Sequence, residues 1–126
     1  MAMHRILVVD DDSDLAGLIQ AALVQRGYNV LIYHNAVDGI KAAMGQKPDL
    51  ILMDVMLPDM SGAEAIRLLK SEQTVKDIPV IFLTGLLSRE ESYGFDNICV
   101  DGQHYTAVAK PFEIEDLLGK IKTNLK

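Results

Sequence analysis

Short apolar runs alternate along the chain with longer stretches in which apolar residues recur every three or four positions. The apolar runs are four or five residues long and rich in β-branched or aromatic side chains. They cover residues 6–9, 30–33, 50–53, 80–83 and 105–109. Continuous apolar runs of this length are typical of strands that are buried on both faces. The pattern therefore predicts five buried strands.

The stretches between these runs carry helix signals. Ser13 is a candidate N-cap, and apolar residues follow it at helical spacing as far as Gly27. Residues 88–100 are also assigned to a helix, although Gly94 interrupts them and the apolar period is loose. The other predicted helices cover residues 36–44, 62–70 and 113–125.

Strands and helices in strict alternation indicate parallel strands joined by right-handed crossovers. We therefore predict an α/β fold: a doubly wound five-stranded parallel sheet with five helices. The 126 residues correspond to one domain, and no linker or repeat divides residues 1–126. In such a fold, ligands bind beyond the carboxyl ends of the strands.

Composition and charge exclude several classes of function. There are 12 Lys and Arg against 18 Asp and Glu, and no basic run dense enough to follow a phosphate backbone, so direct nucleic-acid binding by this chain is not expected. The sequence has neither an apolar stretch of about 18 residues nor a signal-peptide pattern, which predicts a cytoplasmic protein that does not bind a membrane. The single cysteine, Cys99, lies between Ile98 and Val100 and is predicted to be a small buried residue.

Polar side chains follow four of the five predicted strands. They are Asp10, Asp11, Asp12, Asp54, Thr84 and Lys110. Each one alone fits a turn, a helix cap or a surface position. Together, acids from separate parts of the chain would repel one another at one sheet edge unless a cation or Lys110 neutralised them. Carboxylate oxygens suit a hard ion, so Mg²⁺ is the predicted ligand, whereas the histidines and Cys99 lack the spacing of a soft-metal site.

Four sequence blocks together resemble a known family. They are Ile-Leu-Val-Val-Asp-Asp at 6–11, Ile-Leu-Met-Asp-Val-Met-Leu-Pro-Asp-Met-Ser-Gly at 51–62, Val-Ile-Phe-Leu-Thr-Gly at 80–85 and Lys-Pro-Phe at 110–112. In order and spacing they resemble the receiver domain of two-component response regulators, which has a CheY-like, flavodoxin-like fold. The resemblance spans essentially the whole chain, and its most specific part is Asp54 followed by Pro58 and Gly62. It implies a single receiver domain over residues 1–126.

The resemblance also implies roles for individual residues. Asp54 matches the phosphoacceptor, which receives a phosphoryl group from the phosphohistidine of a sensor histidine kinase or a phosphotransfer protein. Asp10, Asp11, Asp54 and the backbone carbonyl of Met56 match the ligands of Mg²⁺, with Asp11 bound directly and Asp10 through water. The triple acid run also permits the pair Asp11 and Asp12, but the family places its acidic pair directly after the strand, which favours Asp10 and Asp11.

Thr84 matches the hydroxyl that hydrogen-bonds the phosphoryl oxygens, and Lys110 matches the ammonium group that pairs first with Asp54 and then with the phosphoryl group. These assignments agree with the general need of phosphoryl transfer for charge neutralisation around the equatorial oxygens. The resemblance further implies a cis bond between Lys110 and Pro111. Small Gly85 beside Thr84 is expected to leave room for the incoming donor.

The sequence departs from the family in its last third. Receivers usually carry an aromatic residue three positions before the lysine, where this chain has Ala107. Tyr105 is the nearest aromatic residue on that strand, and either a core role or a displaced switch role fits it. Met56 and Leu86 are apolar residues beside the site, from which we hypothesise that water attack is restricted and the phosphoryl state is long-lived.

We expect a phosphorylation-dependent switch more than an enzyme, with self-phosphorylation from small phosphodonors and slow self-dephosphorylation as the resemblance implies. A downstream protein reads the switched surface, and a homodimer formed on phosphorylation is left open, as is whether the chain acts alone or within a longer regulator. One alternative is a receiver-like binding module that is never phosphorylated. The other is a Mg²⁺-dependent phosphatase of the haloacid-dehalogenase type, with Asp10, Asp12, Thr84 and Lys110 in its site, which leaves Asp54 unexplained.

Overall fold

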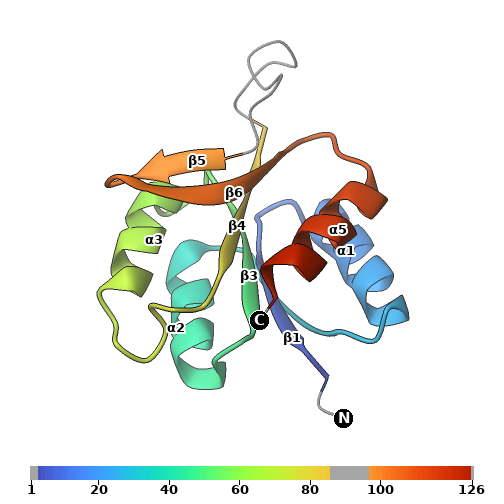
Figure 1. The fold of residues 1–126 in the computed structure, drawn as a ribbon, viewed down its shortest axis with the longest axis horizontal. Coiled ribbons are helices and arrows are strands. Elements are labelled where there is room, and N and C mark those ends of the chain that lie inside the picture. Colours follow the sequence, from blue (N-terminus) through green and yellow to red (C-terminus); the bar gives the residue numbers. More distant parts are fainter. Residues whose placement is uncertain (1–2, 86–96, 126) are drawn as a thin grey trace.

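The chain folds as a doubly wound α/β sandwich, as the alternation of apolar runs and helical stretches predicts. The computed structural model describes residues 3–85 and 97–125 (Figure 1). Its sheet has six strands in the order β2-β1-β3-β4-β6-β5, and every neighbouring pair is parallel except β5 with β6. The strands are β1 (Arg5–Val9), β2 (Asn29–Tyr33), β3 (Leu50–Asp54), β4 (Val80–Thr84), β5 (Asn97–Val100) and β6 (Gln103–Ala109).

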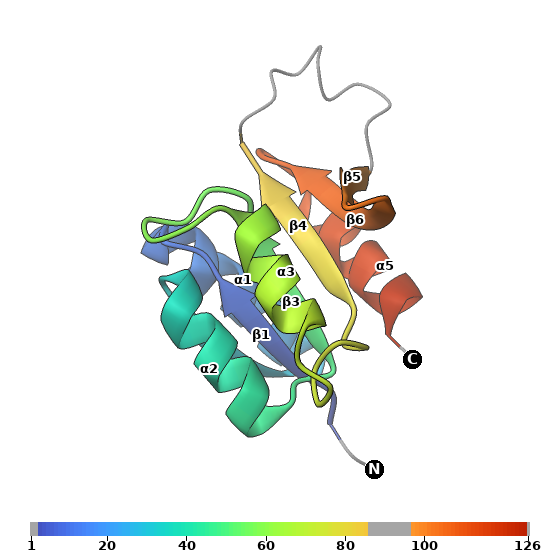
Figure 2. The same cartoon turned by 90° about the vertical axis from the view of Figure 1, so that its left-hand side faces the viewer.

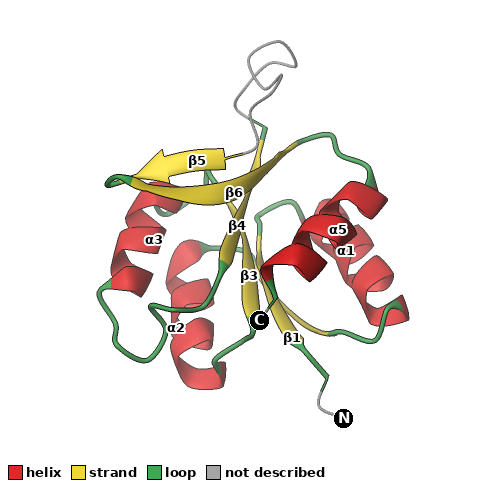
Figure 3. Ribbon diagram, viewed as in Figure 1, coloured by secondary structure: helices red, strands yellow, loops and turns green. Residues whose placement is uncertain are grey.

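Helices cover both faces of the sheet (Figures 2 and 3). Within the described residues they are α1 (Ser13–Gln25), α2 (Ala36–Gln46), α3 (Gly62–Lys70) and α5 (Ile114–Asn124). Helices α1 and α5 pack with one buried apolar cluster, and α2 and α3 pack with another on the opposite face. Within the described residues, none of the helices has the length and apolar character needed to cross a membrane.

The caps of α1 and α2 differ from the sequence prediction. The N-cap of α1 is Asp12 rather than Ser13, because the Asp12 side chain accepts a hydrogen bond from the backbone N–H of Leu15. Helix α2 runs past Gly45 to Gln46, and Lys47 ends it in the left-handed conformation with φ of 46°.

The predicted helix over residues 88–100 is wrong at its carboxyl end. Residues 97–100 form strand β5, which pairs antiparallel with β6, so the sheet has six strands rather than five. Asp101 and Gly102 link the two strands with φ values of 52° and 84°, the left-handed backbone of a two-residue hairpin turn. This turn brings Ile98 and Val100 against the core, which the loose helical period did not reveal. The rest of that predicted helix lies outside the described residues.

Strand β5 also corrects the prediction for Cys99. The Cys99 side chain is exposed, whereas the neighbouring Val100 is buried. Successive side chains of a strand point to opposite faces, so apolar neighbours in sequence do not imply burial of the residue between them.

The start of α3 lies unusually close to the ends of β3 and β4. A Cβ atom at Gly62 would lie 2.9 Å from the Phe82 ring and 3.0 Å from the backbone carbonyl oxygen of Asp54. The Gly62 N–H also donates to the carbonyl of Val55. A glycine at this position is therefore required for α3 to begin directly behind the carboxyl end of β3.

Candidate functional site

The carboxyl ends of four strands bring the predicted site residues together. Asp10 directly follows β1, Asp54 and Thr84 end β3 and β4, and Lys110 directly follows β6. Asp10, Asp54 and Thr84 are 0%, 7% and 4% exposed, and they are the buried polar side chains of the described residues. Burial of a polar group is unfavourable unless it is paired, so this concentration at one sheet edge marks a functional site.

Lys110 bridges the two buried carboxylates. Its Nζ atom donates to Asp10 Oδ2 at 2.9 Å and to Asp54 Oδ2 at 3.2 Å. The Lys110 side chain is 22% exposed, so the bridge is largely shielded from water. One ammonium group thus neutralises part of the charge of two carboxylates that come from different strands.

The third carboxylate of the cluster belongs to Asp11, which is exposed. One oxygen atom from each of Asp10, Asp11 and Asp54 lies within 4.8 Å of the other two. With Lys110 counted, this cluster carries two formal negative charges more than positive ones. Its donor atoms are carboxylate oxygens, and its excess charge matches a hard divalent cation such as Mg²⁺.

Asp12 differs from the other two acids of the triple run in its contacts. The Asp12 N–H donates to Asp10 Oδ1 at 2.9 Å, while the Asp12 carboxylate caps α1. The cluster contains Asp10 and Asp11, and Asp12 is not among its members. The geometry therefore favours the predicted pair Asp10 and Asp11.

Met56 lies beside Asp54 on the loop that follows β3. Its N–H donates to Asp54 Oδ1 at 3.1 Å, and its side chain is 59% exposed. A bridge between Met56 and Ser61 closes this loop, with the flanking bonds made from Leu57 N–H to the Met60 carbonyl and from Gly62 N–H to the Val55 carbonyl. The Met56 carbonyl takes part in neither bond.

Burial and neighbouring charges shift the titration of both partners in the bridge. The pKa of Asp54 is raised above its usual value, chiefly by burial and also by the negative charge of Asp10. The hydrogen bond from the Met56 N–H and the contact with Lys110 lower this pKa but do not outweigh burial. For Lys110, burial lowers the pKa, but the hydrogen bond and charge of Asp10, together with Asp54, outweigh it and the net pKa is raised. Lys110 is therefore held in its charged form.

Thr84 and Lys110 are also joined through the backbone. The Lys110 N–H donates to the Thr84 carbonyl at 2.7 Å, so the ends of β4 and β6 are fixed relative to each other. A Cβ atom at Gly85 would lie 3.8 Å from the Lys110 side chain, which is an ordinary contact. The bond between Lys110 and Pro111 is cis, as expected from the resemblance. Leu86 lies outside the described residues.

Tyr105 is a core residue in this structure. Its ring packs edge-on against Phe82 at 5.8 Å between centroids, and the Lys70 ammonium lies 5.5 Å from the ring centre. Burial, and then the charge of Asp101, raises the pKa of its hydroxyl group. This position under α3 fits the core role rather than the switch role considered for Tyr105.

Two residues near the site were not singled out from the sequence. His34 Nδ1 lies 2.9 Å from the carbonyl oxygen of Asp10, and the Asp59 carboxylate accepts the N–H groups of Ala36 and Val37 at 2.8 and 2.9 Å. Both contacts depend on β2 lying next to β1, which no local sequence signal indicates.

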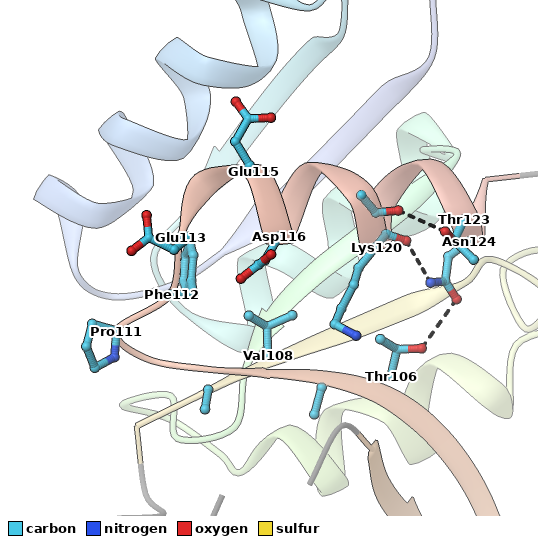
Figure 4. Close-up of a pocket in the computed structure, with 13 residues that line it drawn as sticks. Thr106, Val108, Pro111, Phe112, Glu113, Glu115, Asp116, Lys120, Thr123 and Asn124 are labelled. Atoms are coloured by element: carbon cyan, nitrogen blue, oxygen red, sulfur yellow. Dashed lines mark hydrogen bonds between the residues drawn. The ribbon is translucent and has the colours of Figure 1, made fainter. Parts of the chain in front are cut away.

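A groove of about 870 Å³ lies between β6 and α5, apart from the acidic cluster (Figure 4). Thr106 and Val108 of β6 face Asp116 and Lys120 of α5 across it, and Thr106 is hydrogen-bonded to Asn124. None of the three clustered acids lines this groove. It is therefore not part of the acidic site.

Comparison with known proteins identifies the family. A model of the response regulator receiver domain matches residues 6–122. The uncharacterized transcriptional regulatory protein YkoG of Bacillus subtilis is 39% identical over all of this chain and 53% of its own length. The DNA-binding dual master transcriptional regulator RpaA of Synechocystis is 36% identical over 98% of this chain and 50% of its own length. The chain thus spans about half the length of these curated relatives.

Solved structures show the same relationship. A CheY-like response regulator receiver domain protein from Methanospirillum hungatei superposes with a TM-score of 0.79 at 30% identity, covering 97% of this chain and 93% of that protein. A chemotaxis response regulator of Vibrio cholerae superposes with a TM-score of 0.81 at 25% identity, covering 98% of this chain and all of that protein. The fold, the sequence blocks and these matches agree, and the chain belongs to the response regulator receiver domain family.

Proposed function

We propose that this chain is a phosphorylation-dependent switch in which Asp54 accepts a phosphoryl group from the phosphohistidine of a sensor histidine kinase or a phosphotransfer protein. The observation that carries the proposal is the bridge of Lys110 to both Asp10 and Asp54, set beside a third carboxylate. Such a site holds a buried nucleophile next to both a fixed cation and a place for a second one.

Asp10, Asp11, Asp54 and the Met56 carbonyl are the proposed ligands of Mg²⁺. When bound, this ion supplies positive charge that offsets the excess negative charge of the carboxylates and of the incoming phosphoryl oxygens. Oxygen donors and the two formal negative charges left by Lys110 support this assignment.

Asp54 is the nucleophile of the proposed reaction. One of its carboxylate oxygens attacks phosphorus in line, a phosphorus–oxygen bond forms, and the phosphorus–nitrogen bond breaks with its electron pair going to the departing histidine nitrogen. The attack requires the carboxylate form of Asp54, which positive charge from Lys110 and a bound Mg²⁺ would favour.

Lys110 and Thr84 act on the transferred group. Lys110, which pairs with Asp54 before the reaction at 3.2 Å, is close enough to pair with the phosphoryl oxygens after it. The Thr84 hydroxyl, at the end of the neighbouring strand β4, donates a hydrogen bond to the same oxygens. Charge neutralisation from these directions is what phosphoryl transfer requires.

The output is a change in protein contacts rather than turnover of a substrate. The phosphoryl group shifts the balance between two conformations, and a downstream protein or a second copy of the chain reads the result. Self-phosphorylation from small phosphodonors and slow self-dephosphorylation belong to this proposal, as do a location in the cytoplasm and a single receiver domain over residues 1–126. Its relatives RpaA and YkoG are named as transcriptional regulators, but the acidic balance of this chain argues against DNA contact by this domain.

The capping role of Asp12 favours this proposal over a haloacid-dehalogenase-type phosphatase. That alternative uses Asp12 as a site carboxylate, whereas the Asp12 side chain bonds the N–H of Leu15 at 3.1 Å. A binding module that is never phosphorylated would have no need for a buried carboxylate with a raised pKa beside a lysine.

Intact-mass measurement after incubation with Mg²⁺ and acetyl phosphate tests the proposal. We expect one added phosphoryl group in the wild type and none in Asp54→Asn or in a sample with EDTA. Asp14→Asn, an acid-to-amide change outside the cluster, is the matched control and should be phosphorylated as the wild type is. An adduct that persists in Asp54→Asn would show that another residue is the acceptor.

A further inference from the structure

The segment from the last residue of β2 to the first turn of α2, residues 33–37, supplies none of the proposed ligands but contacts both loops that carry them. We refer to it as the β2–α2 connection. Its second residue, His34, places Nδ1 2.9 Å from the carbonyl oxygen of Asp10. A carbonyl oxygen only accepts hydrogen bonds, so Nδ1 carries the hydrogen and donates it.

With this contact, both backbone polar groups of Asp10 are hydrogen-bonded to the β2–α2 connection. The Asp10 N–H donates to the carbonyl of Tyr33 at 3.1 Å, and its carbonyl accepts from His34. The same carbonyl belongs to the peptide group that joins Asp10 to Asp11. Because a peptide group is planar, fixing this carbonyl also fixes the direction in which the backbone enters Asp11.

The second contact reaches the loop after β3. Both carboxylate oxygens of Asp59 accept backbone N–H groups, from Ala36 at 2.8 Å and from Val37 at 2.9 Å. These N–H groups open α2, where they have no partner within the helix and the helix dipole favours a negative charge. Asp59 lies three residues after Met56, on the loop closed by the bridge between Met56 and Ser61.

The proposed ligands need this support because all of them except Asp54 lie beyond the strand ends. Strand β1 ends at Val9 and β3 ends at Asp54, so the sheet fixes Asp54 but not Asp11 or the Met56 carbonyl. Metal ligands generally depend on such outer contacts for their orientation.

We propose that the β2–α2 connection braces the metal site, with His34 and Asp59 as positioning residues that act through Asp10 and Met56 respectively. This inference rests on the proposed function, because the ion concerned is the Mg²⁺ of that site. It assigns a role to an element that would otherwise only join a strand to a helix.

The test measures Mg²⁺ affinity directly, on the whole chain and without any phosphodonor. Isothermal titration calorimetry suits it because the chain has no tryptophan to report binding by fluorescence. We expect His34→Ala to raise the Mg²⁺ dissociation constant about tenfold. His34→Asn keeps an N–H donor near the position of Nδ1 and should recover most of the affinity.

Asn35→Ala is the matched control for loss of stability. The Asn35 side chain accepts the N–H of Asp38 at 2.9 Å and caps α2, so it lies in the same connection, and its side-chain hydrogen bonds within the described residues go to Asp38 and not to a ligand loop. Its replacement should lower the melting temperature and leave the Mg²⁺ dissociation constant unchanged. An effect on affinity as large as that of His34→Ala would overturn the proposal, because a weakened α2 would then account for both.

For Asp59, the informative comparison is between Asp59→Asn and Asp59→Ala, since both remove the same charge. Asparagine keeps one acceptor for the N–H groups of α2 and alanine keeps none, so Asp59→Ala should bind Mg²⁺ several-fold more weakly than Asp59→Asn. Equal affinities of these two variants would contradict the role given to Asp59.

The outcomes also separate this inference from the proposed function. If the wild type accepts a phosphoryl group and His34→Ala binds Mg²⁺ as tightly as the wild type, the positioning role of His34 is contradicted and the proposed function stands. If the wild type neither binds Mg²⁺ nor accepts a phosphoryl group, both are wrong.

Discussion

The ammonium group of Lys110 lies 3.2 Å from Asp54 Oδ2, although 56 residues separate the two along the chain. The same group lies 2.9 Å from Asp10, which has no exposed surface. Two buried carboxylates therefore depend on one cation that enters from the far end of the sequence. This dependence governs both the stability of the metal-free protein and the chemistry proposed for it.

Replacing Lys110 should leave Asp10 and Asp54 as uncompensated buried charges. We expect Lys110→Met to lower the free energy of unfolding in EDTA by about 3 kcal/mol, since removal of one partner of a buried ion pair is costly. Added Mg²⁺ should restore part of the loss by replacing the missing charge. Urea unfolding with and without Mg²⁺ measures both effects, with Lys41→Met as the exposed-lysine control. A variant as stable as the wild type in EDTA would contradict the importance of the bridge.

The raised pKa of Asp54 predicts that its ionised carboxylate lowers the stability of the metal-free protein at neutral pH. The folded state binds this proton more tightly than the unfolded state, so the contribution of Asp54 to stability is lost as the pH rises from its usual pKa of 3.8 through the raised value. In EDTA at neutral pH, Asp54→Asn should therefore melt at a higher temperature than the wild type. This advantage should shrink as the pH falls toward 3.8, and also when Mg²⁺ is added. Thermal unfolding across this pH range checks it, and an asparagine variant that melts below the wild type at neutral pH would refute it.

Asp59 should show the opposite pH dependence. Its bonds from the N–H groups of Ala36 and Val37 lower its pKa, so its stabilising effect is present above the usual value of 3.8 and is lost as the pH falls through the lowered value. Asp59→Ala should lower the melting temperature by a few degrees at neutral pH and converge with the wild type in acid. Asn35→Ala removes a neutral cap from the same helix, so the loss of that cap should not titrate in this range. If Asp59→Ala lowered the melting temperature by the same amount at all pH values, the stabilising role of the ionised Asp59 carboxylate would be contradicted.

Met56 should control how long the phosphoryl group survives. Its backbone N–H bonds Asp54 and its apolar side chain is exposed, and our hypothesis is that this side chain limits the ordering of an attacking water molecule. Met56→Asn offers a polar group that orients such a water molecule, so the phosphoryl group should be lost several-fold faster. The decay of the phosphorylated mass after removal of acetyl phosphate measures the rate. Equal rates in the two proteins would remove the hypothesis, and Leu68→Asn, at an exposed leucine of α3, controls for a general effect of the change.

Much of the site could be predicted from the sequence because parallel strands buried on both faces leave continuous apolar runs. The polar residues directly after such runs must meet at one sheet edge, which brings Asp10, Asp54, Thr84 and Lys110 together without knowledge of the strand order. The resemblance already favoured Asp10 and Asp11 over Asp12, and the structure adds a physical reason, because the Asp12 carboxylate caps α1.

The remaining features depend on strand order or on short segments with ambiguous patterns. Residues 97–100 are too few to show a period, although Asp101 and Gly102 carry a recognisable hairpin signal. The contacts of His34 and Asp59 arise because β2 is the neighbour of β1, a relationship between elements rather than within one. Local sequence patterns do not contain this information.

The most direct test of the central claim is to locate the phosphoryl group chemically. An acyl phosphate is reduced by borohydride to an alcohol, which converts the acceptor aspartate to homoserine and marks its position in the chain. After incubation with Mg²⁺ and acetyl phosphate, peptide mass mapping of the reduced protein should find homoserine at position 54 and at no other aspartate. Homoserine at another position, or at none while Mg²⁺ binding is intact, would contradict the account.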